Sequence, residues 1–184
     1  MEIKLPVKIY KNEISEYLNK IRSEYIMLSG RGYIEGIMCL DQDAKIMAVD
    51  NFFKDNLNAW DLAALAAAQF GISQQARNCF DAQELEHSVI IFKDKQFFIR
   101  AIGELDLDGK GRRHLILGVL ADKNVNIGLI ILQMKKYAQI INEKIKLNNE
   151  LKAQLKMNET EMKEYIKSIK SNLFKTQVIN APIK

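Results

Sequence analysis

The spacing of apolar residues divides the first half of the chain into strand and helix patterns. Residues 3–9 alternate with a period of two, which predicts a short strand. Pro6 confines that strand to a sheet edge, because proline has no N–H to donate. Residues 13–27 have apolar side chains at helical spacing, and Asn12 before them is a typical helix cap. A second helix, rich in alanine, is predicted from residue 58 to about residue 80.

Five further apolar runs are short and rich in residues that favour strands. They lie at 33–40, 44–49, 87–92, 96–102 and 113–120. Short polar links join the first run to the second and the third to the fourth, which is a hairpin signal. Strands joined by short turns pair antiparallel. The sequence therefore predicts an α+β fold, with a five-stranded antiparallel sheet and helices packed on it.

The last part of the chain has a helical pattern that continues much further than one domain needs. It starts near Asn126 and ends near Leu173, and a helix of about 48 residues would span about 70 Å, more than twice the width of a small domain. We therefore expect its second half to protrude, to fold back at a break, or to pair with another chain. The side chains expected to pack along it are Leu151, Leu155, Met162, Ile166 and Ile169.

Three partners are open for this C-terminal helix: its own domain, a second helix and a membrane surface. Its heptad pattern places Asn158 in the apolar seam, so a coiled coil would be weak by itself. A row of lysines would suit an anionic membrane, but four glutamates on the same stretch would oppose it. We favour packing on the domain or on a partner helix.

These patterns suggest four parts of the chain. Residues 1–32 are an N-terminal extension with an edge strand and a helix, and residues 33–145 form the main domain. Residues 146–175 form a helical extension, and residues 176–184 are a loose tail.

Net charge changes this picture little, because all of it lies in the last forty residues. The chain of 184 residues has a formal net charge of +4, while residues 1–142 contain 18 basic and 18 acidic side chains. A neutral domain has no basic groove for a polyanion, so we expect no nucleic-acid partner. No apolar run is long enough to cross a bilayer and the N-terminus has no signal-peptide core, so we expect a cytoplasmic protein without integral membrane contact.

Candidate catalytic and metal-binding groups are few. Gly109 and Gly111 flank a lysine between strands, where a hairpin tip is favoured over a phosphate loop. His87 and His114 have no partner at metal-ligand spacing. Cys39 and the second cysteine, at position 79, lie in apolar segments and are expected to be buried thiols. The sequence therefore predicts no enzyme, no metal site and no cofactor.

The order of the elements resembles the roadblock/dynein-light-chain family, including the bacterial and archaeal members that regulate small GTPases. Four segments carry the resemblance: the hairpin GYIEGIMCLDQDAKIMAVD, the helix NAWDLAALAAAQFGISQQA, the strand pair EHSVIIFKDKQFFIRAIG, and the final strand and helix HLILGVLADKNVNIGLIILQMKKYAQII. They cover about 60% of the chain, from Tyr33 to about Ile145. Related α+β folds, such as longin or profilin-like domains, share this order.

The resemblance implies a non-enzymatic protein that forms homodimers or roadblock-type heterodimers. In such dimers the middle helices pack together and the third strands pair edge to edge, which gives a platform for a Ras-like small GTPase. Some members act as GTPase-activating proteins, whereas others are scaffolds. The interface residues that this implies are Ala59, Ala63, Ala66, Ala67, Phe70, Val89 and Ile91.

Two alternatives stay open at this point. The alanine-rich side of the middle helix could lie on the sheet of its own domain rather than on a second subunit. The protein could also be a ligand-sensing or signalling input domain that transmits a conformational change through its long C-terminal helix.

Overall fold

The structure is a computed structural model, and it describes residues 11–53, 57–107, 111–156 and residue 160. The strand predicted over residues 3–9 and the predicted tail lie outside the described residues. So do three of the side chains expected to pack along the C-terminal helix, which are Met162, Ile166 and Ile169.

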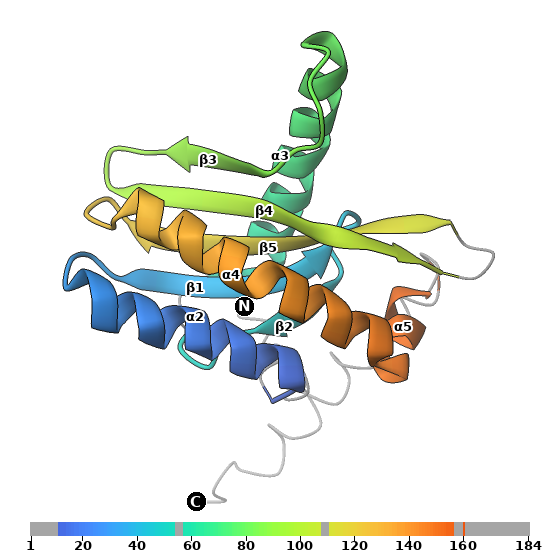
Figure 1. The fold of residues 1–184 in the computed structure, drawn as a ribbon, viewed down its shortest axis with the longest axis horizontal. Coiled ribbons are helices and arrows are strands. Elements are labelled where there is room, and N and C mark those ends of the chain that lie inside the picture. Colours follow the sequence, from blue (N-terminus) through green and yellow to red (C-terminus); the bar gives the residue numbers. More distant parts are fainter. Residues whose placement is uncertain (1–10, 54–56, 108–110, 157–159, 161–184) are drawn as a thin grey trace, which may run out of the picture.

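One antiparallel sheet of five strands forms the centre of the domain (Figure 1). Its strands are β1 (Ile34–Asp41), β2 (Ile46–Val49), β3 (His87–Ile91), β4 (Lys95–Asp106) and β5 (Arg112–Asp122). Their order across the sheet is β2-β1-β5-β4-β3, so β5 lies in the middle and β2 and β3 form the edges. This arrangement confirms the predicted fold class.

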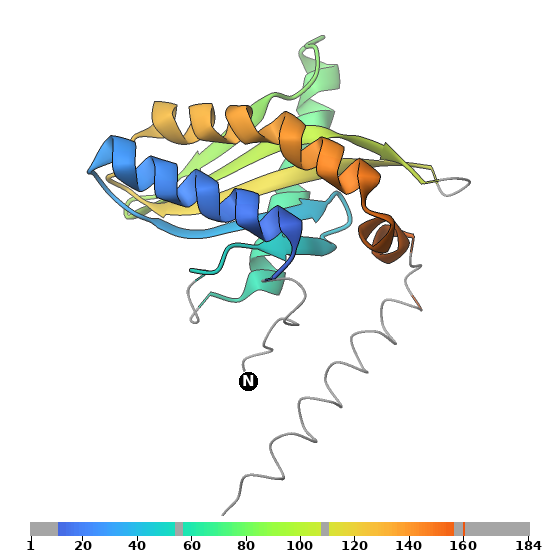
Figure 2. The same ribbon diagram turned by 60° about the horizontal axis from the view of Figure 1, so that its bottom comes forward.

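The described helices lie in two layers, one on each side of the sheet. They are α2 (Glu13–Ser29), α3 (Ala59–Cys79), α4 (Ile127–Leu147) and α5 (Asn149–Leu155). Figure 2 shows α2 and α4 side by side over one face, while α3 crosses the opposite face. None of the helices in the described part of the chain is both long and apolar enough to cross a membrane.

Helices α2, α3 and α4 each begin behind an asparagine. The Asn12 side chain accepts a hydrogen bond from the Ser15 N–H at 2.9 Å, and Asn126 accepts one from Leu129 at 3.1 Å. Asn58 caps α3 in the same way. Each cap satisfies an N–H group that has no partner within its own helix.

Helix α2 packs against the sheet and against α4. Four of its apolar side chains are buried in the core between the sheet, α2 and α4: Ile14, Leu18, Ile21 and Tyr25. Helix α2 therefore covers part of one face of the sheet, beside α4.

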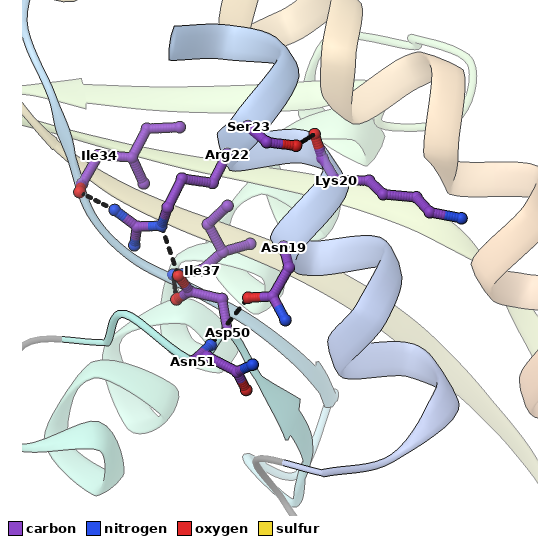
Figure 3. A network of polar contacts seen from close by, with 8 residues as sticks. All are labelled: Asn19, Lys20, Arg22, Ser23, Ile34, Ile37, Asp50 and Asn51. Carbon is purple, nitrogen blue, oxygen red and sulfur yellow. Dashed lines mark hydrogen bonds and ion pairs between the residues drawn. The ribbon is translucent and has the colours of Figure 1, made fainter.

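A buried ion pair joins α2 to the first hairpin (Figure 3). The Arg22 Nε atom lies 2.5 Å from Asp50 Oδ2, and both side chains are buried. Arg22 also donates to the carbonyl oxygen of Ile34, while Asp50 Oδ1 accepts from the Ile37 N–H at 2.8 Å. Every bond in this network crosses between the helix and the hairpin or closes the hairpin, so it fixes α2 against the sheet.

The helical pattern predicted from residue 126 is interrupted at Asn148, which is the break that the sequence left open as one of three outcomes. Residues 161–173 of the pattern lie outside the described residues. Asn148 has φ −91° and ψ 103°, which is not helical, and α5 begins after it. Asn148 then caps α5, since its side chain accepts a hydrogen bond from the Leu151 N–H at 3.1 Å. Leu151 and Leu155 are buried in the core beside α4, so α5 packs on its own domain.

Candidate protein-interaction surface

Helix α3 places its alanines against the sheet of its own domain. Ala59, Ala63, Ala66 and Phe70 are buried among side chains of β1, β4 and β5. Small side chains let the helix backbone come close to the strands that it crosses. In the single chain these four side chains are therefore covered by the domain's own sheet, as in the alternative that the sequence left open. Ala67 is half-buried at the side of the helix.

The opposite side of α3 is exposed and partly apolar. Leu65 and Ile72 are seven residues apart, which places them two turns apart on one side of the helix. Both are exposed, and Ile72 retains 68% of its accessible surface. Ala68 lies between them and is also exposed. This stripe faces away from the sheet.

The C-terminal half of α3 extends beyond the sheet. Figure 1 shows α3 passing behind the strands and continuing past the edge strand β3. Phe80, directly after the helix, is largely exposed, and so is Cys79. The predicted burial of Cys79 is therefore wrong, because it lies in the part of the helix that no strand covers. The predicted burial of Cys39 is confirmed.

Strand β3 forms the edge of the sheet next to this projecting helix. It pairs with β4, and no described strand lies on its other side. A hydrogen bond of 2.9 Å from Gln69 Nε2 to Ser88 Oγ joins β3 to α3. Val89 is half-buried against the core on the α4 face, whereas Ile91 and Phe92 are exposed.

We group the exposed apolar residues of α3 and of the open β3 edge under the name α3–β3 surface, defined by Leu65, Ile72, Phe80, Ile91 and Phe92. Ile91 lies on the same face of the sheet as Val89, so the two parts of this surface meet at the strand edge. The α3–β3 surface combines exposed apolar side chains with an open strand edge. Exposed apolar groups of this size are typical of protein-contact surfaces, and an open edge can pair with another strand. The arrangement is suited to binding a protein chain.

Four residues of the α3–β3 surface were missed by the sequence reasoning, which selected Ile91 but not Leu65, Ile72, Phe80 or Phe92. That reasoning looked for small residues because close helix contact needs them. The signal that could have found Leu65 and Ile72 is their separation of seven residues, opposite the Ala59–Ala66 side of the helix.

Catalytic or metal-binding chemistry has little support in the described residues. Among them, no three His, Cys, Asp or Glu side chains gather to hold a metal ion. Burial raises the pKa of the Cys39 thiol well above its usual range, which keeps it protonated and unreactive. Arg100 donates to Glu86 at 3.1 Å, and Arg100 and Lys135 together hold the pKa of that carboxyl below its usual range. These charged groups neutralise one another.

Among the comparisons with known proteins, only the one with solved structures finds matches, and it identifies the fold. No family model matches the sequence and no curated protein matches it. Solved structures do match: a Roadblock/LC7 domain from Streptomyces avermitilis has 18% identity, covers 70% of this chain and 97% of its own, and has a TM-score of 0.55.

Two MglB structures are similar to about the same degree. MglB from Myxococcus xanthus has 12% identity, covers 74% of this chain and 98% of its own, and has a TM-score of 0.59. An MglB described with a tetrameric arrangement has 15% identity, covers 76% of this chain and 96% of its own, and has a TM-score of 0.56. Because nearly the whole of each neighbour is covered at TM-scores above 0.5, this chain has the roadblock fold.

Proposed function

We propose that this protein is a non-enzymatic regulator or scaffold that dimerises through its α3–β3 surface and binds a Ras-like small GTPase in the cytoplasm. The observation that carries the proposal is the projecting half of α3 beside the open edge of β3, on a roadblock fold. A homodimer and a heterodimer with a second roadblock chain would use the same surface.

Support for a dimer comes from the apolar side chains and the open strand edge that this surface exposes in the single chain. The exposed side of α3 carries Leu65 and Ile72, and the edge strand ends at Ile91, with Phe92 directly after it. Pairing of two β3 strands would satisfy backbone groups of both edges. The same approach would bring the projecting helices together and remove their apolar side chains from water, which stabilises the pair.

Support for a GTPase partner comes from the family that the sequence resembles, whose members regulate small GTPases. Paired α3 helices would form the platform on which the GTPase lies. An activator of this type would reshape the GTPase's own switch loops and supply no catalytic arginine. Arg100 fits that expectation, because it is buried and already paired with Glu86.

The first experiment measures the mass of the full chain by light scattering, with Ile72→Glu as the variant. A charge placed on the exposed apolar stripe should turn a dimer into a monomer, because it would be buried without a partner at the interface. The matched control is Leu132→Glu, which alters an exposed side chain on α4, on the other face of the sheet. It should leave the mass unchanged.

A strict monomer at all concentrations, both alone and mixed with other roadblock chains, would overturn the dimer. If a dimer forms, GTP hydrolysis by candidate Ras-like GTPases is then measured with and without it. Faster hydrolysis identifies an activator, and binding without a change in rate identifies a scaffold. Absence of binding to every such GTPase would leave the dimer standing and remove the GTPase from the proposal.

A further inference from the structure

Strand β4 is much longer than the strand that covers its outer side. Its residues Gln96–Arg100 pair with β3, but the described residues contain no strand that pairs with Ala101–Asp106 on that side. On the other side β5 pairs with β4 along its whole length. Figure 1 shows β4 continuing beyond the start of β3. The backbone of this half of β4 therefore forms a second open edge, distinct from that of β3.

A groove of about 1140 Å³ runs along this second edge. Its floor is the part of β4 from Arg100 to Glu104, and one wall is α4 with Gln139 and Lys146. The opposite wall is the connection 82–86 between α3 and β3, together with Arg77 near the end of α3. The open edge of β4 therefore lies between α4 and the 82–86 connection and faces the groove.

Most charged side chains around the groove are paired within the described part of the chain, and the unpaired ones are mainly basic. Glu86 is already paired with Arg100 and Lys135, and Glu104 lies 3.7 Å from Arg112 and 3.3 Å from His114. The lining also contains two cations that have no ion pair among the described residues, which are Arg77 and Lys146. Glu84 is the one acidic residue of the lining that likewise has no ion pair among the described residues.

Arg100 adds a second signal at the floor of the groove. Its side chain is nine-tenths buried, and its Nε and Nη1 atoms have no hydrogen-bond acceptor within the part of the chain that the structure describes. Buried donors without acceptors are rare in folded proteins. Both atoms have almost no accessible surface, so an acceptor from the groove would reach them once the Arg100 side chain shifts toward it.

From these observations we propose that the groove binds an extended, acidic peptide segment of a partner protein by adding it as a strand to β4. The open edge supplies hydrogen bonds to the peptide backbone, which is how strand addition recognises its ligands. Arg77 and Lys146 on opposite walls favour acidic side chains. The proposal goes beyond the dimer, because it uses β4 and α4 rather than the β3 edge.

The test uses the full chain and three blocked nonapeptides. The first alternates valine with glutamate, the second has lysine in place of every glutamate, and the third is the glutamate peptide with N-methyl groups along one backbone edge. Fluorescence anisotropy should show binding of the first peptide at least about fivefold tighter than binding of the second, since each exposed charge pair contributes little alone. The N-methylated peptide should not bind, because its edge cannot donate.

Hydrogen exchange locates the peptide on the protein. Exchange of the amides at Ala101–Asp106 should slow when the glutamate peptide binds, while exchange at His87–Ile91 should not change. Slowing at His87–Ile91 instead would place the peptide on β3 and overturn the proposal. So would equal affinity for the glutamate and lysine peptides, or no binding of either.

Charge variants test the walls of the groove without touching the core. Replacing Arg77 and Lys146 together by glutamine should weaken the glutamate peptide about fivefold. The matched control replaces Lys93 and Lys123 by glutamine, which removes the same charge from exposed turns outside the groove. If the two double variants weaken binding equally, the affinity depends only on the net charge of the protein, and the proposal fails.

Discussion

The two faces of the sheet are built in different ways. The face covered by α2 and α4 has large side chains throughout, including Tyr25, Phe98 and Tyr137, and two helices lie over it side by side. The other face is covered by α3 alone, mainly through alanines, and half of that helix projects past the sheet. One face is covered by two helices that lie over the sheet, whereas the helix on the other face continues past the sheet edge.

This difference suggests that one face of the sheet mainly stabilises the fold, while the helix on the other face is available for contact with a partner. Burying a large apolar side chain stabilises a fold by about 1.5–3 kcal/mol, and an alanine contributes far less. The α2–α4 face should therefore supply most of the stability, while α3 can present an outer side to a partner. Substitutions on the two faces should then have different consequences, and they are considered below from the largest expected effect to the smallest.

The largest loss of stability should follow Asp50→Ala. This change leaves Arg22 buried without its partner and should lower the free energy of unfolding by about 3–5 kcal/mol. Urea denaturation measures the loss. The double replacement Arg22→Met with Asp50→Leu removes both charges and should cost clearly less; a loss as large as that of Asp50→Ala would show that the ion pair itself is not the cause.

Leu155→Ala should be the next most damaging change. Leu155 is buried on the α2–α4 side, and loss of a buried leucine side chain leaves a cavity that costs about 2–5 kcal/mol. Leu147→Ala, at the exposed last residue of α4, should alter stability by less than about 0.5 kcal/mol. Similar values for the two variants would mean that α5 does not hold its position against the domain in solution.

On the other face, replacing alanine by leucine should destabilise the protein on the inner side of α3 but not on its outer side. Ala66→Leu forces a larger side chain between helix and sheet and should cost about 1–3 kcal/mol. Ala68→Leu, on the exposed side, should change monomer stability by less than about 0.5 kcal/mol. Thermal melting of both variants checks the orientation of the helix, and the reverse ranking would contradict it.

The smallest effect should be a pH dependence on the α2–α4 face. Hydrogen bonds from Lys136 and Tyr137 hold the pKa of Glu24 below its usual value of 4.5. The ionised form is therefore favoured by folding, so its stabilisation is present above pH 4.5 and is lost as the pH falls through the lowered pKa.

Denaturation midpoints of the wild type and Glu24→Gln measure this contribution. The midpoints should differ at neutral pH and converge on acidification. Glu16→Gln, an exposed change on the same helix, serves as the control and should follow the wild type. A difference between wild type and Glu24→Gln that persists unchanged at low pH would contradict the assignment.

Local signals in the sequence were sufficient to predict most of the elements. Asn12, Asn58 and Asn126 each precede an apolar helical pattern, and each caps a helix in the structure. The short polar links likewise predicted the hairpins. The position of the break, Asn148, was missed because no glycine or proline marks it. It does have a detectable signal, since an asparagine followed by a glutamate two residues later is typical of a helix start.

Contacts between distant segments were beyond the reach of local patterns. Arg22 and Asp50 are 28 residues apart, and nothing near either residue indicates the other. The alanines of α3 posed a second problem, because they occur all around the helix and no apolar periodicity distinguishes the inner side from the outer side. The sheet alone decides which of them are buried.

The break at Asn148 has a mechanical consequence. A helix transmits rotation and translation along its axis only while its hydrogen-bond ladder is continuous, and Asn148 interrupts that ladder between α4 and α5. A twist of α4 would be absorbed at this joint rather than carried along a rigid rod. The interruption weighs against a signalling domain whose output travels through one long C-terminal helix.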